Sequence, residues 1–202
     1  MYELITDRFY KEIEAYPDLV IDYCLIKDNQ PYRGEASHKK AVLFAMEQIS
    51  QRWQAIRGVP WYWESEILFA KRISADELLW LPDKPYKQTK YGVTSYNKEI
   101  IKQESTGQRL PYWYAFLEPP HGTQFKILPD GRKIEHEYTI EDFQGVNQIL
   151  FPNGTKDLTV LEWNTDWSDY FNEGHEWWGA ACWSVYDHSL ERFVIIMASA
   201  TD

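Results

Sequence analysis

The sequence predicts a single α+β domain over residues 1–202, with N-terminal helices and a mainly antiparallel sheet that ends in a C-terminal hairpin. Helical spacing of apolar residues comes early in the chain, whereas two fully apolar stretches, "WWGAACWSVY" and "RFVIIMASA", come at its end. A chain of this length fits one domain, and no internal repeat or low-complexity segment divides it.

Two helices are expected first. Between Thr6 and Tyr16 apolar residues recur at helical spacing, and Pro17 ends the segment. A longer helix should begin at an N-cap, Ser37, and end at Arg57 before Gly58. Its apolar stripe is predicted to consist of Ala41, Phe44, Ala45, Ile49, Trp53 and Ile56. The stretch between the two helices, "DLVIDYCLI", fits either a helix or a strand.

The middle of the chain alternates strands and short helices. "VPWYWESEILFAKR" is predicted as a strand region, and "SADELLWL" as a short helix capped by Ser74. The polar, lysine-rich residues 82–109 are expected to form a mobile loop, with a short helix around "NKEIIKQ". "LPYWYAFLEPP" is predicted as a buried strand because of its aromatic content. A hairpin turning at Pro129–Gly131 and a helix from Thr139 to Leu150 should follow.

The C-terminal strands are expected to lie at the centre of the sheet. If 177–186 is a strand, Ala181, Trp183 and Val185 face one way, and Cys182 and Tyr186 face the other. Both faces are apolar, as they are in the partner strand "RFVIIMASA". Strands of this kind are covered on both sides, so Cys182 is predicted to be a buried thiol and not a nucleophile.

An acidic helix is expected just before these strands. Thr165 can cap a short helix that ends at Gly174. One face of it would carry Asp166, Asp169 and Glu173, and the other Trp167, Tyr170 and Phe171. The acidic face is either a solvated surface or a binding surface for a basic partner, and both interpretations stay open.

A second candidate site combines histidines and carboxylates. Glu118 and His121 lie at the exit of the predicted strand "LPYWYAFLEPP", and His175 and Glu176 precede the Trp177 strand. If the two places meet, these four candidate catalytic residues would share a cleft suited to acid–base work. With Asp166, His121 and His175 would be candidate metal ligands. Alternatively, Pro119 and Pro120 merely end a strand that His121 caps. The other histidines, His38, His136 and His188, are expected to face solvent.

Charge and motifs exclude several function classes. The net charge is −10, and residues 153–202 hold nine acids against two bases, which disfavours binding to nucleic acid. No metal or cofactor is expected, because the nucleotide-binding and zinc-protease motifs are absent and the two cysteines form no CxxC pair. The charged N-terminus and the shortness of the longest apolar run predict a cytoplasmic protein that does not enter membranes.

The pattern "EWNTDWSDYFNEGHEWWGAACWSVYDHSLERFVIIMASATD", with "YWYAFLEPPHG" upstream, resembles a family of small acidic bacterial proteins with no assigned activity. This resemblance covers about a third of the chain and supplies no catalytic residues. The acidic character is also similar in style to immunity proteins encoded beside bacterial toxins.

Three functions are therefore considered. The leading one is a non-enzymatic, immunity-like protein that binds a basic protein through an acidic-aromatic surface. The alternatives are a hydrolase-like or metal-dependent enzyme built on His121 and His175, and a carbohydrate or small-ligand binder that uses some of the ten tryptophans.

Overall fold

The structure, a computed structural model, describes residues 1–81, 86–88, 94–96, 110–120, 123–176 and 179–199. The strands are β1 (Tyr2–Glu3), β2 (Ile21–Lys27), β3 (Ala70–Ile73), β4 (Tyr86–Gln88), β5 (Thr94–Tyr96), β6 (Phe125–Ile127), β7 (Lys133–Glu135), β8 (Leu158–Trp163), β9 (Ala180–Asp187) and β10 (Arg192–Ser199). The helices are α1 (Arg8–Ile13), α2 (Glu35–Arg57), α3 (Ala75–Leu78), α5 (Tyr112–Leu117), α6 (Ile140–Leu150) and α7 (Asn172–Glu176), with 3₁₀ turns η1 (Ser65–Ile67) and η2 (Asp169–Phe171).

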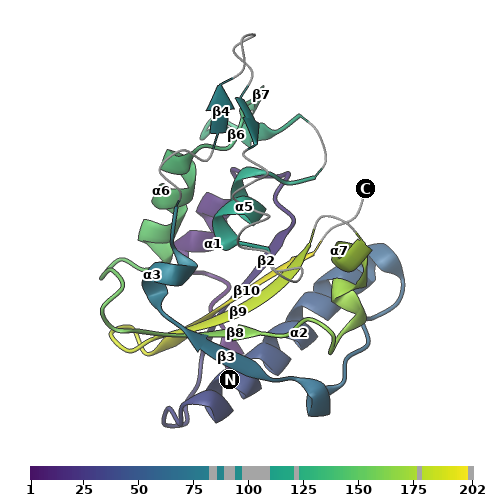
Figure 1. The fold of residues 1–202 in the computed structure, drawn as a ribbon, viewed down its shortest axis with the longest axis vertical. Coiled ribbons are helices and arrows are strands. Elements are labelled where there is room, and N and C mark those ends of the chain that lie inside the picture. The colour runs from purple at the N-terminus through teal and green to yellow at the C-terminus, as the bar shows by residue number, and fades with distance from the viewer. Residues whose placement is uncertain (82–85, 89–93, 97–109, 121–122, 177–178, 200–202) are drawn as a thin grey trace.

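An antiparallel sheet of six strands, in the order β1-β2-β10-β9-β8-β3, organises the described residues (Figure 1). The predicted C-terminal hairpin is confirmed, because β9 and β10 pair with Val185 opposite Val194. The ambiguous stretch "DLVIDYCLI" contains strand β2, in which Cys24 lies opposite Ile195 of β10. The α+β class with a mainly antiparallel sheet is therefore confirmed.

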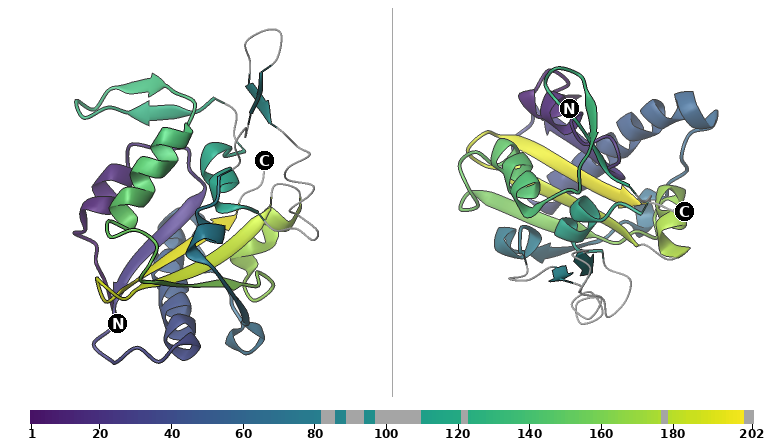
Figure 2. Two further views of the ribbon diagram at one scale, coloured as in Figure 1. Left: turned by 60° about the vertical axis from the view of Figure 1, so that its left-hand side comes forward. Right: turned by 90° about the horizontal axis from the view of Figure 1, so that it is seen from above.

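Helices cover both faces of this sheet (Figure 2). Trp183 and Val185 point into one core, where they meet residues of α1, α5 and α6. Cys182 and Ile195 point into the other core, which is closed by α2. The alternation predicted for β9 is thus confirmed, and Cys182 is a fully buried free thiol.

Helix α2 begins and packs differently from the prediction. It starts at Glu35 after Gly34, whose φ of 62° suits glycine, while the Ser37 hydroxyl accepts a hydrogen bond from the Arg33 N–H at 2.8 Å. Its buried side consists of His38, Ala41, Val42, Ala45, Met46, Ile49 and Ser50. The predicted stripe was therefore partly wrong, since Trp53 and Ile56 are exposed. Small residues on the buried side let the helix approach the sheet closely.

Helix α5 corrects the prediction that "LPYWYAFLEPP" is a strand. Pro111 occupies its N-cap position, and the Ala115 N–H donates to the Pro111 carbonyl at 3.0 Å. The helix buries Tyr112, Trp113, Ala115, Phe116 and Leu117, so apolar residues surround it on nearly every side. A helix of this kind shows no polar face, and its sequence therefore resembles a buried strand.

The remaining elements follow the sequence more closely. Strand β3 takes up only the end of the predicted strand region, and Ser74 caps α3 by accepting the Glu77 N–H at 3.0 Å. The β6–β7 hairpin and helix α6 form as predicted. Within 82–109, β4 and β5 pair, and the rest of the expected loop lies outside the described residues. Across the described helices, none is long and apolar enough to span a membrane.

Candidate functional site

The predicted cluster of histidines and carboxylates is only partly described. His121 and the side chain of Glu176 lie outside the described residues, so their convergence with Glu118 and His175 stays a prediction. Within the described part of the chain, no group of three or more His, Cys, Asp or Glu side chains could hold a metal ion.

Glu118 and His175 belong to different layers of the fold. Glu118 is the C-cap of α5, and burial, followed by the charge of Glu137, raises its pKa to about 7. His175 lies on α7, just after Phe171 of the opposite core, with its Nε2 atom 2.7 Å from the Thr165 hydroxyl. The structure therefore attaches these two candidates to opposite faces of the sheet.

The predicted acidic helix is replaced by two shorter pieces, η2 and α7. Ser168, and not Thr165, caps the first turn, because its hydroxyl accepts the Tyr170 N–H at 3.2 Å. Thr165 instead contacts His175. The three aromatic residues expected on the inner face, Trp167, Tyr170 and Phe171, are buried as predicted.

The three predicted binding acids have different environments. Asp166 and Glu173 are exposed. Asp169 is half-buried, and its Oδ1 atom accepts the Tyr62 N–H at 2.7 Å while its own N–H donates to the Tyr62 carbonyl at 3.1 Å. Asp169 therefore holds two segments together, and Asp166 and Glu173 remain free of such a structural role.

Hydrogen bonds join the segment that follows α2 to residues 164–169. The Glu64 N–H donates to the Trp167 carbonyl at 2.7 Å, and the Phe69 N–H donates to Asn164 Oδ1 at 3.0 Å. The Asn164 amide in turn donates to the Ile67 carbonyl at 3.1 Å. These bonds fix the backbone of an exposed loop, which local sequence patterns did not indicate because the partners are far apart in the chain.

This loop presents what we call the acidic-aromatic surface: Tyr62, Glu64, Glu66, Ile67, Phe69 and Asp166. Tyr62 and Phe69 are each 64% exposed and Ile67 is 42% exposed, so three large apolar side chains are exposed within one short segment. The Tyr62 hydroxyl donates to Glu64 Oε1 at 3.3 Å, and the charges of Glu64 and Glu66 raise the pKa of this tyrosine. Aromatic and acidic groups are thus close neighbours here.

Phe69 and Asp166 are joined by a hollow of about 250 Å³, into which Lys71 also faces. The described residues provide no ion-pair partner for Glu64, Glu66 or Asp166. Their charges are therefore uncompensated at short range, and the surface offers rings for contact and carboxylates for a cationic partner.

A serine–histidine pair in the described chain is structural and not catalytic. His38 was predicted to face solvent, but it is fully buried between α2 and β9, with Nδ1 2.8 Å from the Ser184 hydroxyl. Ser184 also accepts the Trp163 indole N–H at 2.8 Å, and the Tyr32 hydroxyl lies 3.0 Å from His38 Nε2. Burial lowers the pKa of His38 to about 4, so the ring is neutral.

The other two histidines also have defined places. His136 is half-buried beside Asp142 of α6, 2.7 Å from its Oδ2 atom, so the expectation of a solvent-facing side chain was only partly right. His188 is exposed as expected. The described histidines thus give no catalytic pair at a surface.

No protein-family model, curated protein or solved structure matches this chain.

Proposed function

We propose that this protein is a non-enzymatic binding protein that engages a basic protein through the acidic-aromatic surface. The proposal rests on one observation, the exposure of Tyr62 and Phe69 beside carboxylates that have no ion-pair partner among the described residues. Exposed apolar side chains rimmed by charge are typical of interaction sites.

The surface has the physical properties that such binding requires. Its rings supply apolar contact area, and Glu64, Glu66 and Asp166 attract a positively charged partner and repel nucleic acid. The hydrogen bonds to Asn164 and Trp167 already fix the loop, so little conformational entropy is lost on binding.

The immunity-like role is the form of this proposal that fits the composition best. A net charge of −10 complements a basic toxin and accelerates association with it. Two buried free thiols suit the reducing cytoplasm, where we propose that the protein acts. The hydrolase-like or metal-dependent enzyme and the carbohydrate or small-ligand binder remain predictions.

The test is charge reversal with a matched control. A variant carrying Glu64→Lys, Glu66→Lys and Asp166→Lys should stay folded, because exposed acids contribute within about 0.5 kcal/mol each to stability. The control, Glu14→Lys, Glu135→Lys and Glu141→Lys, changes the net charge equally at other exposed sites. Proteins captured by the wild type from lysate of the source cells would be identified, purified and titrated against all three forms.

The expected result is a basic partner whose Kd rises at least about tenfold for the surface variant and changes little for the control. Added salt should also weaken the wild-type complex. The proposal is wrong if both variants lose binding equally, since net charge alone would then explain it, or if no basic protein binds.

A further inference from the structure

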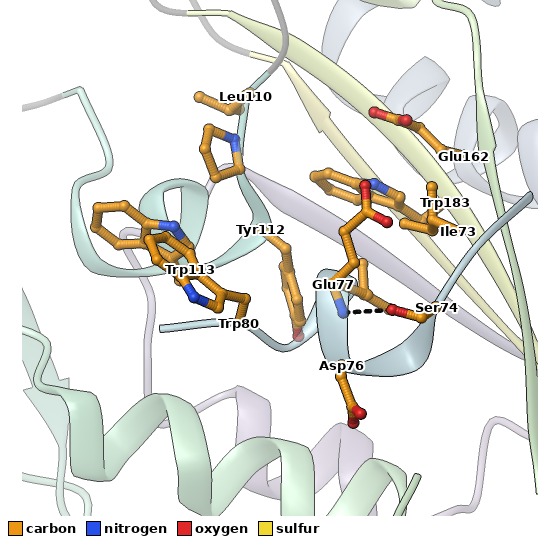
Figure 3. A pocket seen from close by; sticks show the side chains of 12 residues that line it. Ile73, Ser74, Asp76, Glu77, Trp80, Leu110, Tyr112, Trp113, Glu162 and Trp183 are labelled. Carbon is orange, nitrogen blue, oxygen red and sulfur yellow. Dashed lines mark hydrogen bonds between the residues drawn. The ribbon is translucent and has the colours of Figure 1, made fainter. Parts of the chain in front are cut away.

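A pocket of about 610 Å³ lies between α3, the start of α5 and the sheet (Figure 3). It adjoins the hollow beside Phe69 and Asp166, because Leu110 and Glu162 line both. Its size is that of a small-molecule site. The lining combines rings with carboxylates: Tyr112, Trp113 and Trp183 form the inner wall, Trp80 stands at the mouth, and Asp76, Glu77 and Glu162 supply the acids. The question is which ligand this combination suits.

The aromatic wall is rigid. Trp113 packs edge-on against Trp80 with ring centres 6.3 Å apart, and Tyr112 lies 5.7 Å from Trp183. The Tyr112 hydroxyl is 3.0 Å from the Tyr23 hydroxyl inside the core, which holds the ring in place. The inner rings are almost fully buried, whereas Trp80 is 41% exposed, so Trp80 offers the accessible ring surface.

The carboxylates are placed by the first turn of α3. Because the Ser74 hydroxyl accepts the Glu77 N–H, the helix begins at Ala75 and sends Glu77 and Asp76 in different directions. In Figure 3 the Glu77 side chain reaches into the pocket toward Trp183, and Asp76 points away from the rings. The described residues pair neither acid with a basic side chain.

We propose that this pocket binds a small organic cation, an alkylammonium or guanidinium group with a short apolar body. A cation in this pocket gains attraction from the ring faces that line it and from the Glu77 carboxylate. The acids disfavour anions, and the described residues include no group of three or more His, Cys, Asp or Glu side chains that could hold a metal ion. The proposal does not rest on the proposed protein-binding function.

The experiment titrates the full chain with choline, with agmatine and with 3,3-dimethylbutan-1-ol, the neutral analogue of choline with nearly the same shape. Tryptophan fluorescence and calorimetry report binding. At least one cation should bind about tenfold or more tightly than the neutral alcohol. If neither cation binds more tightly than the neutral alcohol, the proposal is overturned, as it is if lysine or arginine binds only within a peptide.

Variants locate the bound cation. Trp80→Ala should weaken binding by about 3- to 30-fold, and Trp80→Phe should restore part of it, because phenylalanine keeps a ring face. Glu77→Gln should weaken binding by about 3- to 10-fold, whereas the neighbouring Asp76→Asn should have a smaller effect. Circular dichroism and melting temperature establish that each variant is folded.

A second control separates this site from the proposed function. Glu66→Gln, on the acidic-aromatic surface, should leave cation binding within about twofold of the wild type. If Glu66→Gln and Glu77→Gln weaken cation binding equally, the effect comes from overall charge and the pocket assignment is wrong. If no basic protein binds, cation binding that depends on Trp80 and Glu77 would leave the pocket assignment standing by itself.

Discussion

On one face of the sheet a single long helix, α2, packs on β2, β9 and β10, whereas on the other face α1, α5 and α6 share the same central strands. Helix α2 contributes small side chains and a buried chain of hydrogen bonds through His38 and Ser184, and rings such as Trp167 and Phe171 complete the same core. The opposite layer uses interlocked rings, such as Phe143 against Tyr112 and Phe116 at 5.0 and 5.5 Å.

The two cores should therefore lose stability under different conditions. Ring packing depends on volume and is insensitive to pH, so that layer should respond most to truncation. A buried histidine has to stay neutral, so the α2 layer should respond to acid. Substitutions in each layer can test these expectations.

The largest effect should come from adjacent residues of β9 that point to opposite faces. Trp183→Ala should lower the free energy of unfolding by about 3–5 kcal/mol, because the buried indole leaves a large cavity beside Tyr112. Cys182→Ala removes one sulfur from the α2 layer and should cost about 1 kcal/mol. Urea denaturation measures both, and comparable losses would contradict the contrast between the layers.

Acid should act on the α2 layer through His38. Burial, with smaller contributions from the charges of His188 and Arg72, lowers its pKa from 6.5 to about 4. Because the unfolded chain binds the proton more tightly, this group's stabilisation is complete above pH 6.5 and is lost as the pH falls to about 4. The loss should reach about 3 kcal/mol. His38→Gln should abolish it in urea titrations at stepped pH, and an unchanged acid loss would refute the assignment.

Glu118, beside the ring-packed layer, should make the free energy of unfolding depend on pH in the opposite direction. Its pKa is raised to about 7, so the folded protein binds the proton more tightly, and this stabilisation is lost as the pH rises from about 4.5 to about 7. Glu118→Gln should therefore raise the free energy of unfolding at pH 8 by about 1–2 kcal/mol, since the carboxyl is only partly buried, and change little at pH 4. A variant no more stable than the wild type at pH 8 would count against this.

The two windows overlap, so the wild type should show a flatter dependence of stability on pH between about 4.5 and 6.5 than either group alone would give. Replacing Glu118 should expose the steep acid loss of His38. Replacing His38 should expose the opposite slope. A profile of stability against pH for the wild type alone would show neither slope separately.

The smallest effect should come from two acids at the boundary between the α2 layer and the acidic-aromatic surface. Asp169→Ala removes the acceptor of the Tyr62 N–H and should cost about 1 kcal/mol. Asp166→Ala, three residues earlier and exposed, should stay within about 0.5 kcal/mol of the wild type. Thermal melts of the pair suffice, and equal costs would mean that Asp166 also has a structural role.

Local patterns predicted those parts of the fold that local physics decides. Strands β9 and β10 were recognisable because both of their faces are apolar, and α6 because its apolar residues recur at the spacing of an amphipathic helix. Helix α5 was missed because a helix buried on nearly every side shows no periodic polar face. The stripe of α2 was right at Ala41, Ala45 and Ile49, which are buried. It was wrong at its C-terminal end, where Trp53 and Ile56 extend beyond the buried part of the helix and are exposed.

The candidate site depended more on distant contacts. Sequence could identify Asp166 as an exposed acid but could not separate it from Asp169, whose role appears only when Tyr62 lies beside it. The exposure of Tyr62 and Phe69 had no local signal, because aromatic residues near a strand are usually buried. Burial of His38 likewise required knowing that Ser184 would face the same helix.

The pairing of β2 with β10 has a consequence for synthesis of the chain. Cys24 lies opposite Ile195, so the centre of the sheet joins the first large strand to the last. At about 5–20 residues per second, a ribosome needs roughly 10 to 30 s to add β10 after β2 has been made. During that interval β2 has no partner on its inner edge, and its apolar side chains need a chaperone or a provisional contact to avoid aggregation. The sheet can therefore be completed only after β10 has been synthesised.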